Sequence, residues 1–270
     1  MSVAVPGVYS PPMAKHPSFR ADQIDDADLA RLVDVLDKQA AMPGVVRLRA
    51  WAAQALDVRP GERALDVGSG TGRDVAALRA AGADAVGVEP NPGMRSVSAS
   101  RHGDHFVDGD AYRLPFDDAS FDAVRCERVF QHLSDPARAA AEIHRVLRPG
   151  GRAVVLDSDW ATAIIHPGDP AVVSAFMSTM LGLSTNPHSG RRLPGLLSAA
   201  GLTVTDIGSQ ALIQQKVETD LLGLGLAAAL AEGTITEAQR DRFLSDLLAA
   251  EVSGDFHMSV TMFAVLAVRD

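Results

Sequence analysis

A glycine turn between an apolar strand and a helix constrains the fold of this chain more than any other feature. Residues 64–67 (ALDV) predict a short buried strand, residues 68–72 (GSGTG) follow it, and a helical pattern runs on to about Gly82. Glycines at such a turn let main-chain amides approach a ligand at the N-terminus of the helix. They would serve close packing of strand against helix equally well, so the turn alone leaves both interpretations open.

The strand–turn–helix unit recurs along the chain. Residues 85–88 predict a second strand and helix, residues 121–126 another strand with a helix over about 136–147, and residues 152–156 the next strand. This alternation predicts an α/β fold, a Rossmann-like, mostly parallel, seven-stranded sheet with helices on both faces. Ligands bind beyond the carboxyl ends of the strands in such sheets.

The remaining segments are predicted to complete and cover this core. Residues 1–58 contain a Pro-, Ser- and Gly-rich arm and two amphipathic helices, and residues 59–157 form the cofactor-binding core. Residues 158–200 break the alternation and are interpreted as a substrate-side cap insertion. Residues 201–270 complete the sheet with an apolar, β-branched last strand, and the apolar stretch from Leu221 to Ala231 predicts a lid helix or an interior helix.

Composition narrows the class of protein. The chain has 25 Lys and Arg against 34 Asp and Glu, a net charge of −9, and so lacks the basic excess of a nucleic-acid binder. Its one cysteine, Cys126, allows neither an intramolecular disulfide nor a cysteine zinc site, which favours a reducing compartment. No signal peptide or membrane-spanning stretch is recognisable. We expect a cytoplasmic monomer or homodimer acting on a small molecule.

Two carboxylates beside the turn indicate what it binds. Asp66 would attract an ammonium and repel a pyrophosphate, and a dinucleotide fingerprint would need a glycine where Arg73 stands. Glu89 closes the second strand, at the position from which an acid accepts hydrogen bonds from both ribose hydroxyls. The alternatives are turn stabilisation by Asp66 and a solvated acid at Glu89, before Pro90.

Three further residues are candidates for an adenine site. Met94 follows the second strand and would pack against an adenine face, or belong to the core. Asp110 and Ala111 would meet the exocyclic amine and a ring nitrogen through the carboxylate and the main-chain amide. Taken alone, this pair is also typical of an ordinary turn.

The order of motifs resembles a known family. LDVGSGTG, VEPNPGM, GDAYRLPF, FDAV, FQHLSDP and EIHRVLRPGGRAVV follow one another over residues 64–156. This order is similar to that of the class I S-adenosylmethionine-dependent methyltransferases, within them to the branch with quinone-biosynthesis C-methyltransferases and many bacterial small-molecule O-, N- and C-methyltransferases. The resemblance is thin outside those residues, and it implies the fold and S-adenosylmethionine as the cofactor.

The resemblance also implies a role for individual residues. It places the methionine moiety at Asp66, Gly68, Ser69, Gly70 and Thr71, the ribose at Glu89, and adenine at Asp110 and Ala111. Pro90 and Met94, which follow Glu89 in the chain, are further candidates for contact with the cofactor. Glu127 lies where the family's fourth strand ends against the cofactor. The family often has a small or neutral residue there, so Glu127 and Arg128 depart from its pattern, and a salt-bridged pair is the alternative.

Methyl transfer asks little chemistry of the protein, because the sulfonium is already a strong electrophile and the chain has chiefly to align the reactants. A base is needed only where the acceptor carries a proton. His132, after the fourth strand, is the first candidate for a base or substrate orienter, and its alternative is a histidine bonded to backbone or solvent. Tyr9, His166 and His188 are weaker candidates.

Two acids after the fifth strand are candidate metal ligands. Asp157 and Asp159 present two carboxylates, but no third ligand has matching spacing, so we predict no metal site. Trp160 beside them would wall the acceptor site or belong to the core.

The sequence therefore predicts methyl transfer from S-adenosylmethionine to O, N or C of a small molecule in specialised metabolism. One alternative keeps the cofactor as a structural element while the protein catalyses a cyclisation or rearrangement, which would leave the product mass unchanged. A second alternative is a nicotinamide-dependent oxidoreductase, which NAD(P) rather than S-adenosylhomocysteine would stabilise. A non-enzymatic scaffold is the third, and the intact glycine turn and Glu89 argue against it.

Overall fold

The computed structural model describes residues 26–270. Tyr9 and the predicted arm of residues 1–20 lie outside the described residues. Two helices, α1 (Asp26–Ala40) and α2 (Pro43–Leu56), precede the first strand, as the helical spacing predicted. No helix among the described residues is long and apolar enough to cross a membrane.

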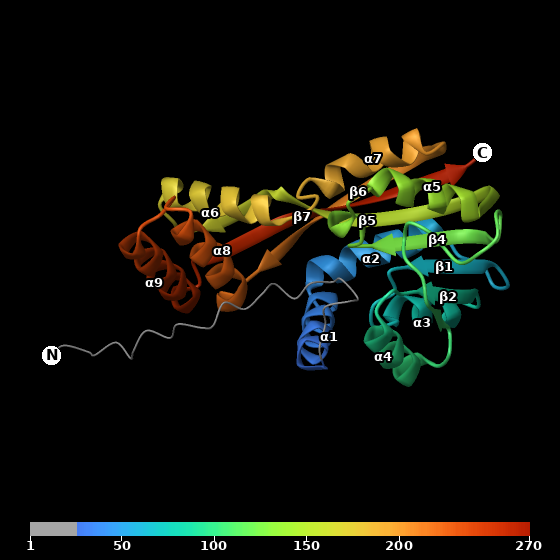
Figure 1. Cartoon of the computed structure of the whole chain (residues 1–270), viewed down its shortest axis with the longest axis horizontal. Helices are drawn as coiled ribbons and strands as arrows, with labels where there is room; N and C mark the ends of the chain where they lie inside the picture. Colours follow the sequence, from blue (N-terminus) through green and yellow to red (C-terminus); the bar gives the residue numbers. More distant parts are fainter. Residues whose placement is uncertain (1–25) are drawn as a thin grey trace.

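A single seven-stranded sheet runs through the described part of the chain (Figure 1). Its order is β3-β2-β1-β4-β5-β7-β6, and β3, β2, β1, β4 and β5 are mutually parallel, whereas β7 runs antiparallel to both β5 and β6. The strands are β1 (Arg63–Val67), β2 (Asp84–Val88), β3 (Phe106–Val107), β4 (Phe121–Glu127), β5 (Leu147–His166), β6 (Leu202–Gln214) and β7 (His257–Arg269). The predicted fold class is confirmed.

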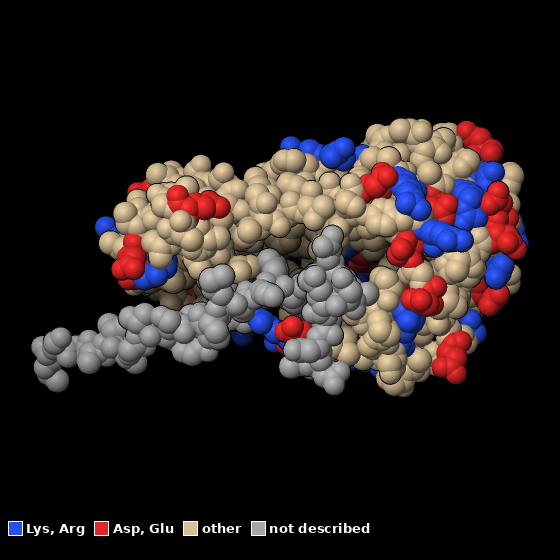
Figure 2. Space-filling view, viewed as in Figure 1, with Lys and Arg blue, Asp and Glu red and all other residues tan. Residues whose placement is uncertain are grey.

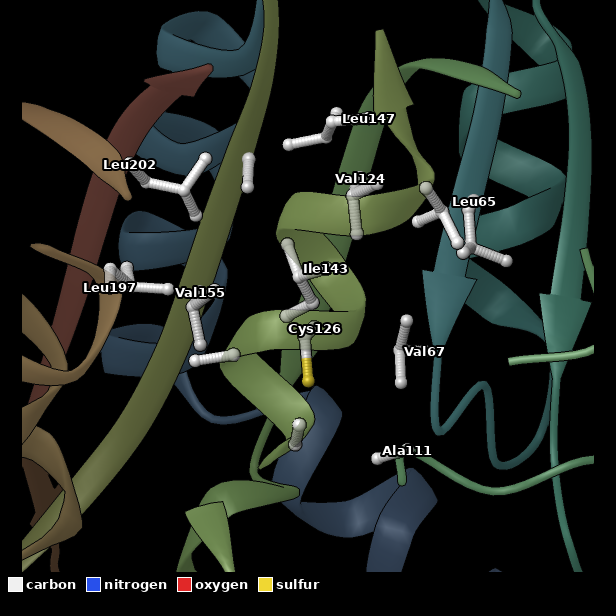
Figure 3. Packing of buried hydrophobic residues seen from close by; sticks show 14 of the residues in the cluster. Leu65, Val67, Ala111, Val124, Cys126, Ile143, Leu147, Val155, Leu197 and Leu202 are labelled. Atoms are coloured by element: carbon white, nitrogen blue, oxygen red, sulfur yellow. The ribbon is translucent and has the colours of Figure 1, made fainter. Parts of the chain in front are cut away.

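Helices cover both faces of the parallel strands. On one face α5 (Pro136–Val146) and α7 (Ser189–Ala199) bury Ile143 and Leu197 against β4 and β5, and Figure 3 shows Ile143 beside Cys126 and Leu197 beside Val155. On the other face α2 and α3 (Arg73–Ala80) bury Leu48 and Val75 against the strands. Helix α4 (Pro92–His102) follows β2. Each face thus has its own apolar core, as expected for a parallel sheet.

Three helices begin at the same local signal, an acid or amide followed by proline. Asn91, Asp135 and Asp169 accept hydrogen bonds from main-chain N–H groups in the first turns of α4, α5 and α6 (Pro170–Leu183). Proline at the first helical position loses no hydrogen bond, because that N–H has no partner within the helix. The sequence thereby fixes where these helices start.

Beyond the parallel core, the last three strands extend into a second unit. Helices α6, α8 (Thr219–Ala231) and α9 (Glu237–Ser253) pack there around a third apolar core that includes Phe176, Leu226 and Phe243. Figure 1 shows these helices at the far end of the long strands from α5. On the face drawn in Figure 2, acidic and basic side chains intermingle over the parallel core and are sparser over this unit.

The fifth strand is longer than the sequence pattern predicted. We expected a strand at residues 152–156, whereas β5 runs from Leu147 to His166 and pairs with β7 along most of its length, with a register shift between Asp159 and Ile164. The polar stretch from Asp157 to Asp159 hides the strand, because those side chains are buried by hydrogen bonding rather than by apolar packing. Residues 158–200 accordingly contain the end of β5, α6 and α7.

Candidate active site

The glycine loop after β1 adopts backbone conformations that side chains disfavour. Gly68, Gly70 and Gly72 have φ values of 73°, 51° and 80°. A Cβ at Gly68 would lie 2.4 Å from Val129 Cγ2, and one at Gly72 would lie 2.5 Å from Phe106 Cζ, so packing explains both glycines. Among the described residues, a Cβ at Gly70 would meet only Leu36 Cδ1 of α1, at 3.6 Å, so it would have room on that side.

Glu89 stands at the end of β2 and holds the loop from the neighbouring strand. Its Oε2 accepts a hydrogen bond from the main-chain N–H of Gly70 at 3.0 Å, and its Oε1 accepts one from that of Asn91, also at 3.0 Å. Burial raises the pKa of Glu89, while these two hydrogen bonds oppose the shift. Each carboxylate oxygen has a second lone pair with which to accept a hydroxyl.

The other predicted cofactor residues on this side lie along the same strand edge. Met94 is 2% exposed on α4, and its N–H donates to Asn91 Oδ1 at 2.9 Å, whereas Pro90 is exposed. Asp110, which is exposed, accepts hydrogen bonds through Oδ1 from Tyr112 N at 2.8 Å and Arg113 N at 3.0 Å, and Ala111 is buried. Asp110 therefore stabilises a turn, as its alternative interpretation held. Both of these hydrogen bonds use Oδ1, and neither uses Oδ2.

A buried cluster of charges lies beneath the loop. Asp66 on β1 stands opposite Arg125 on β4, and Arg125 Nη1 is 3.3 Å from Asp66 Oδ1. Arg125 also pairs with Glu127 and, at 3.2 Å, with Asp74 in the first turn of α3. Arg49 of α2 donates two hydrogen bonds of 2.8 Å to Glu127. Helix α2, strands β1 and β4, and helix α3 thus meet at one ionic site.

The environment shifts the pKa values of these acids in opposite directions. Burial raises the pKa of Asp66 to about 7, although Arg125 pulls it the other way. The pKa of Glu127 is lowered, because the attraction of Arg125, Arg128 and Arg49 outweighs its burial. Arg49, Asp74 and Arg125 were missed from the sequence, although an arginine within the apolar strand FDAVRCE is itself a signal, since buried arginines are almost always paired.

Glu127 and Arg128 form an ion pair, which is the alternative interpretation that the sequence offered for them. Arg128 Nε lies 3.2 Å from Glu127 Oε1, and Arg128 also donates to Gln39 of α1. Arg128 has a left-handed φ of 56°, a conformation uncommon for residues with a side chain, and it tends to mark functional sites. The carboxylate of Glu127 serves three arginines, and a contact from it to the cofactor stays a prediction.

The segment after β4 meets the segment before α7. Residues Phe130–His132 form one 3₁₀ turn, on which His132 is exposed. Gln131 N donates to Asp157 Oδ2 at 2.8 Å, and Gln131 Oε1 accepts from Trp160 Nε1 at 3.1 Å. Asn186 N donates to Gln131 O at 3.0 Å. His132, Trp160 and residues 184–188 are therefore brought to the same edge of the sheet.

The two acids after the fifth strand are engaged by protein donors. Asp157, whose pKa burial raises to about 7, accepts hydrogen bonds from Gln131 N, Ser158 N and Ser189 Oγ. Asp159 pairs with Arg191, whose Nη2 lies 3.0 Å from Oδ1. Among the described residues, no group of three or more His, Cys, Asp or Glu side chains is placed to hold a metal ion.

The remaining histidine candidates lie apart. His188 Nδ1 is 3.8 Å from Asp159 Oδ1, close to the segment that carries His132. His166 ends β5 in the second unit, with Nε2 3.4 Å from Asp255 Oδ2. The structure therefore brings His188, and not His166, to the edge at which Trp160 lies.

Comparison with known proteins places this site in a family. Residues 65–155 match the model of the methyltransferase domain. The chain is 37% identical over 182 residues to the demethylmenaquinone methyltransferase of Beutenbergia cavernae, covering 65% of this chain and 73% of that protein. The chain belongs to the class I S-adenosylmethionine-dependent methyltransferases. This methyltransferase is also 32% identical over 247 residues to an uncharacterised 37.1 kDa protein of transposon Tn4556 from Streptomyces fradiae, covering 87% of this chain and 70% of that protein.

Solved structures agree on the fold of the methyltransferase. The YcgJ protein of Bacillus subtilis aligns with a TM-score of 0.58 at 22% identity, over 82% of this chain and 97% of that one. The cyclase SpnF aligns with a TM-score of 0.50 at 23% identity, over 83% of this chain and 80% of that one. The family membership and the enzyme class that the motif order implied are confirmed.

Proposed function

We propose that this methyltransferase moves a methyl group from S-adenosylmethionine to O, N or C of a small-molecule acceptor. The observation that carries the proposal is the pairing of Glu89 with the open glycine loop. Glu89 is fixed by Gly70 N and Asn91 N, and a Cβ at Gly70 would meet a single atom of the described residues within 4 Å, Leu36 Cδ1. A ribose-accepting carboxylate beside bare main-chain amides fits a nucleoside joined to an amino acid.

The residues present fit the cofactor in a fixed order along the strand edge. Around the methionine moiety we place Asp66, Gly68, Ser69, Gly70 and Thr71; on the ribose Glu89 with Pro90; on adenine Met94, Asp110 and Ala111; and at the end of β4 Glu127. The buried hydroxyl of Ser69 has no hydrogen-bond partner among the described residues, so the loop retains a polar group to satisfy. When bound, the cofactor supplies an electrophilic methyl group on a sulfonium.

The chain's own part is to position the acceptor and to accept a proton. We place the acceptor where the turn with His132 meets Trp160 and residues 184–188, and we assign the capping role to residues 158–200 and α8. His132 would take the proton of a phenol or carbon acid as the new bond to the methyl carbon forms. A neutral amine would need no base until after transfer.

The names of related proteins suggest which acceptors to test first. The demethylmenaquinone methyltransferase of Beutenbergia cavernae acts, by its name, on a quinone precursor. A ring-bearing, moderately apolar acceptor is therefore the first class to test, and a role in specialised metabolism is part of the same proposal.

The product's mass tests the proposal. The purified protein is incubated with S-adenosylmethionine and a panel of demethylated quinols, phenols and amines, and the products are analysed by mass spectrometry. We expect one acceptor to gain a single methylene equivalent, with formation of S-adenosylhomocysteine. A product of unchanged mass formed in the presence of the bound cofactor would contradict methyl transfer and support a cyclisation or rearrangement.

A further inference from the structure

The charged side chains beneath the glycine loop pair with one another in a single cluster. Three guanidinium groups meet three carboxylates, and every one of the six side chains is at most one fifth exposed. The members are Arg49 of α2, Asp66 of β1, Asp74 of α3, Arg125 and Glu127 of β4, and Arg128. Burying paired charges costs desolvation energy that often cancels their attraction, so such a cluster adds little to stability. A role other than stability must therefore explain its position.

The placement of Arg125 supplies that reason. Asp66 lies two residues before the first glycine of the loop, and Asp74 lies two residues after the last. Arg125 binds both, with Nη1 3.3 Å from Asp66 Oδ1 and Nη2 3.2 Å from Asp74 Oδ1. One planar side chain therefore bridges the two ends of the loop, which a lysine, with a single ammonium, cannot do in the same geometry.

The same cluster fastens the N-terminal helices to the loop. Arg49 brings α2 to Glu127 through two hydrogen bonds, and its Nη2 is 3.6 Å from Asp74 Oδ2. Arg128 reaches Gln39 of α1, the helix whose Leu36 borders the space before Gly70. Helices α1 and α2 are thus joined to strands β1 and β4 by one set of ion pairs and hydrogen bonds.

One carboxylate oxygen in the cluster is left over. Among the hydrogen bonds of the described residues, Asp66 uses Oδ1, which faces Arg125, and its Oδ2 accepts none. This side chain is 2% exposed, and an acid held by one cation presents its second oxygen to another. An ammonium group is the complementary partner.

We propose that Arg125 and Arg49 are positioning residues, which clamp the glycine loop so that Asp66 meets the ammonium of the cofactor's amino-acid half. This inference rests on the proposed function. It assigns to the clamp the recognition of the amino-acid half alone, because Glu89, which we place on the ribose, is held by Gly70 N and Asn91 N and has no ion pair with the cluster.

Two ligands separate the halves of the cofactor. S-adenosylhomocysteine carries the amino-acid half, whereas 5′-methylthioadenosine has the same nucleoside and thioether without it. Binding of both is measured by calorimetry for the wild-type protein, Arg125→Lys, Arg49→Gln and Arg47→Gln. Arg47 is the matched control, because it lies on the same helix but pairs with Gln210 at 3.3 Å, outside the cluster.

The clamp predicts a selective loss. Arg125→Lys and Arg49→Gln should each lower the affinity for S-adenosylhomocysteine by about tenfold or more. The affinity for 5′-methylthioadenosine should stay unchanged, because only the amino-acid half of the ligand loses its partner. Arg47→Gln should leave both unchanged. Equal losses for both ligands, or no loss for either, would overturn the inference, since a merely structural role does not discriminate between them.

A second variant keeps the test informative if a cluster arginine cannot be replaced without unfolding. Asp74→Asn removes one end of the bridge at a position that is only partly buried, and it should show the same selective loss. A wild-type protein that binds neither ligand would contradict the proposed function itself. A wild-type protein that binds both, with variants that lose both equally, would contradict the clamp alone.

Discussion

At the scale of single residues, ligand binding at the site depends on the pH at which its carboxylates ionise. Asp66 is buried against Arg125, Asp74 and Glu127, with its pKa raised to about 7. A raised pKa means that the carboxyl is protonated below pH 7 in the folded protein, while the form that attracts an ammonium is the ionised one. The affinity for a cationic ligand should therefore depend on pH near 7, above the range in which unperturbed carboxylates titrate.

We expect the affinity for S-adenosylhomocysteine to rise as the pH rises from 6 to 7.5, by up to about tenfold, since binding selects ionised Asp66. The measurement is calorimetry in buffers of different ionisation enthalpy, which also reports the proton released on binding. Asp66→Asn should bind more weakly and lose the pH dependence. Proton uptake on binding, or an affinity that falls over this range, would refute the role given to Asp66.

The same raised pKa values make a prediction for stability. Asp66 and Asp157 both titrate near 7 in the folded chain and near 4 when unfolded. The unfolded chain therefore loses these protons first, and their contribution to the free energy of unfolding falls as the pH rises from about 4 to about 7. Asp157→Asn should make the free energy of unfolding fall less steeply with pH, by a slope equivalent to up to about one bound proton. Urea unfolding at several pH values measures this slope. An unchanged slope would count against the shift.

Gly70 allows the open space before the loop to be tested directly. Gly70→Ala places a methyl group in that space and costs about 1 kcal/mol of backbone strain, because φ is left-handed. The matched control is Gly61→Ala, where φ is 85° and a Cβ would meet no atom of residues 26–270 within 4 Å. Both variants should lose similar stability in thermal unfolding, but only Gly70→Ala should lose S-adenosylhomocysteine binding. Equal binding by the two would show that the cofactor does not approach Gly70.

At the scale of elements, the sequence predicted those helices and strands whose ends are marked by residues close by in the chain. The apolar strand before the GSGTG turn, the helix that starts at Pro136, and the last strand are all where local signals placed them. Glu89 was placed at a strand end because its distance from the loop along the chain implies its position in space.

The parts that the sequence missed depend on pairing between distant elements. Arg125 lies opposite Asp66 because β4 pairs with β1 in one particular register. The residues next to Arg125 in the sequence do not indicate which side chains it pairs with. Likewise, β5 extends past Asp157 because buried donors from Gln131 and Ser189 satisfy that acid. Sheet register and buried hydrogen bonding are properties of the assembled chain, which periodicity along the sequence does not report.

At the scale of the whole molecule, the sheet joins two units with separate apolar cores. The third core, around Phe243 and Phe176, shares no residue with the two that flank the parallel strands. Phe243→Ala should therefore cost about 3 to 5 kcal/mol of stability in α6, α8 and α9, as large-to-small core substitutions do. Hydrogen exchange should show faster opening of these helices, with β1 and β4 still protected and S-adenosylhomocysteine binding retained. Uniform loss of protection would mean that the two units unfold together.

The most direct test of the account is whether S-adenosylhomocysteine binds through Glu89. Calorimetry compares the wild-type protein with Glu89→Gln and with Asp108→Asn, an exposed acid that pairs with Arg95 near the same strand edge. We predict binding by the wild type, an affinity at least about tenfold lower for Glu89→Gln, and no change for Asp108→Asn, because a charged acceptor of the ribose hydroxyls is lost only in the first. Wild-type protein that binds NAD(P) and not S-adenosylhomocysteine would contradict the account.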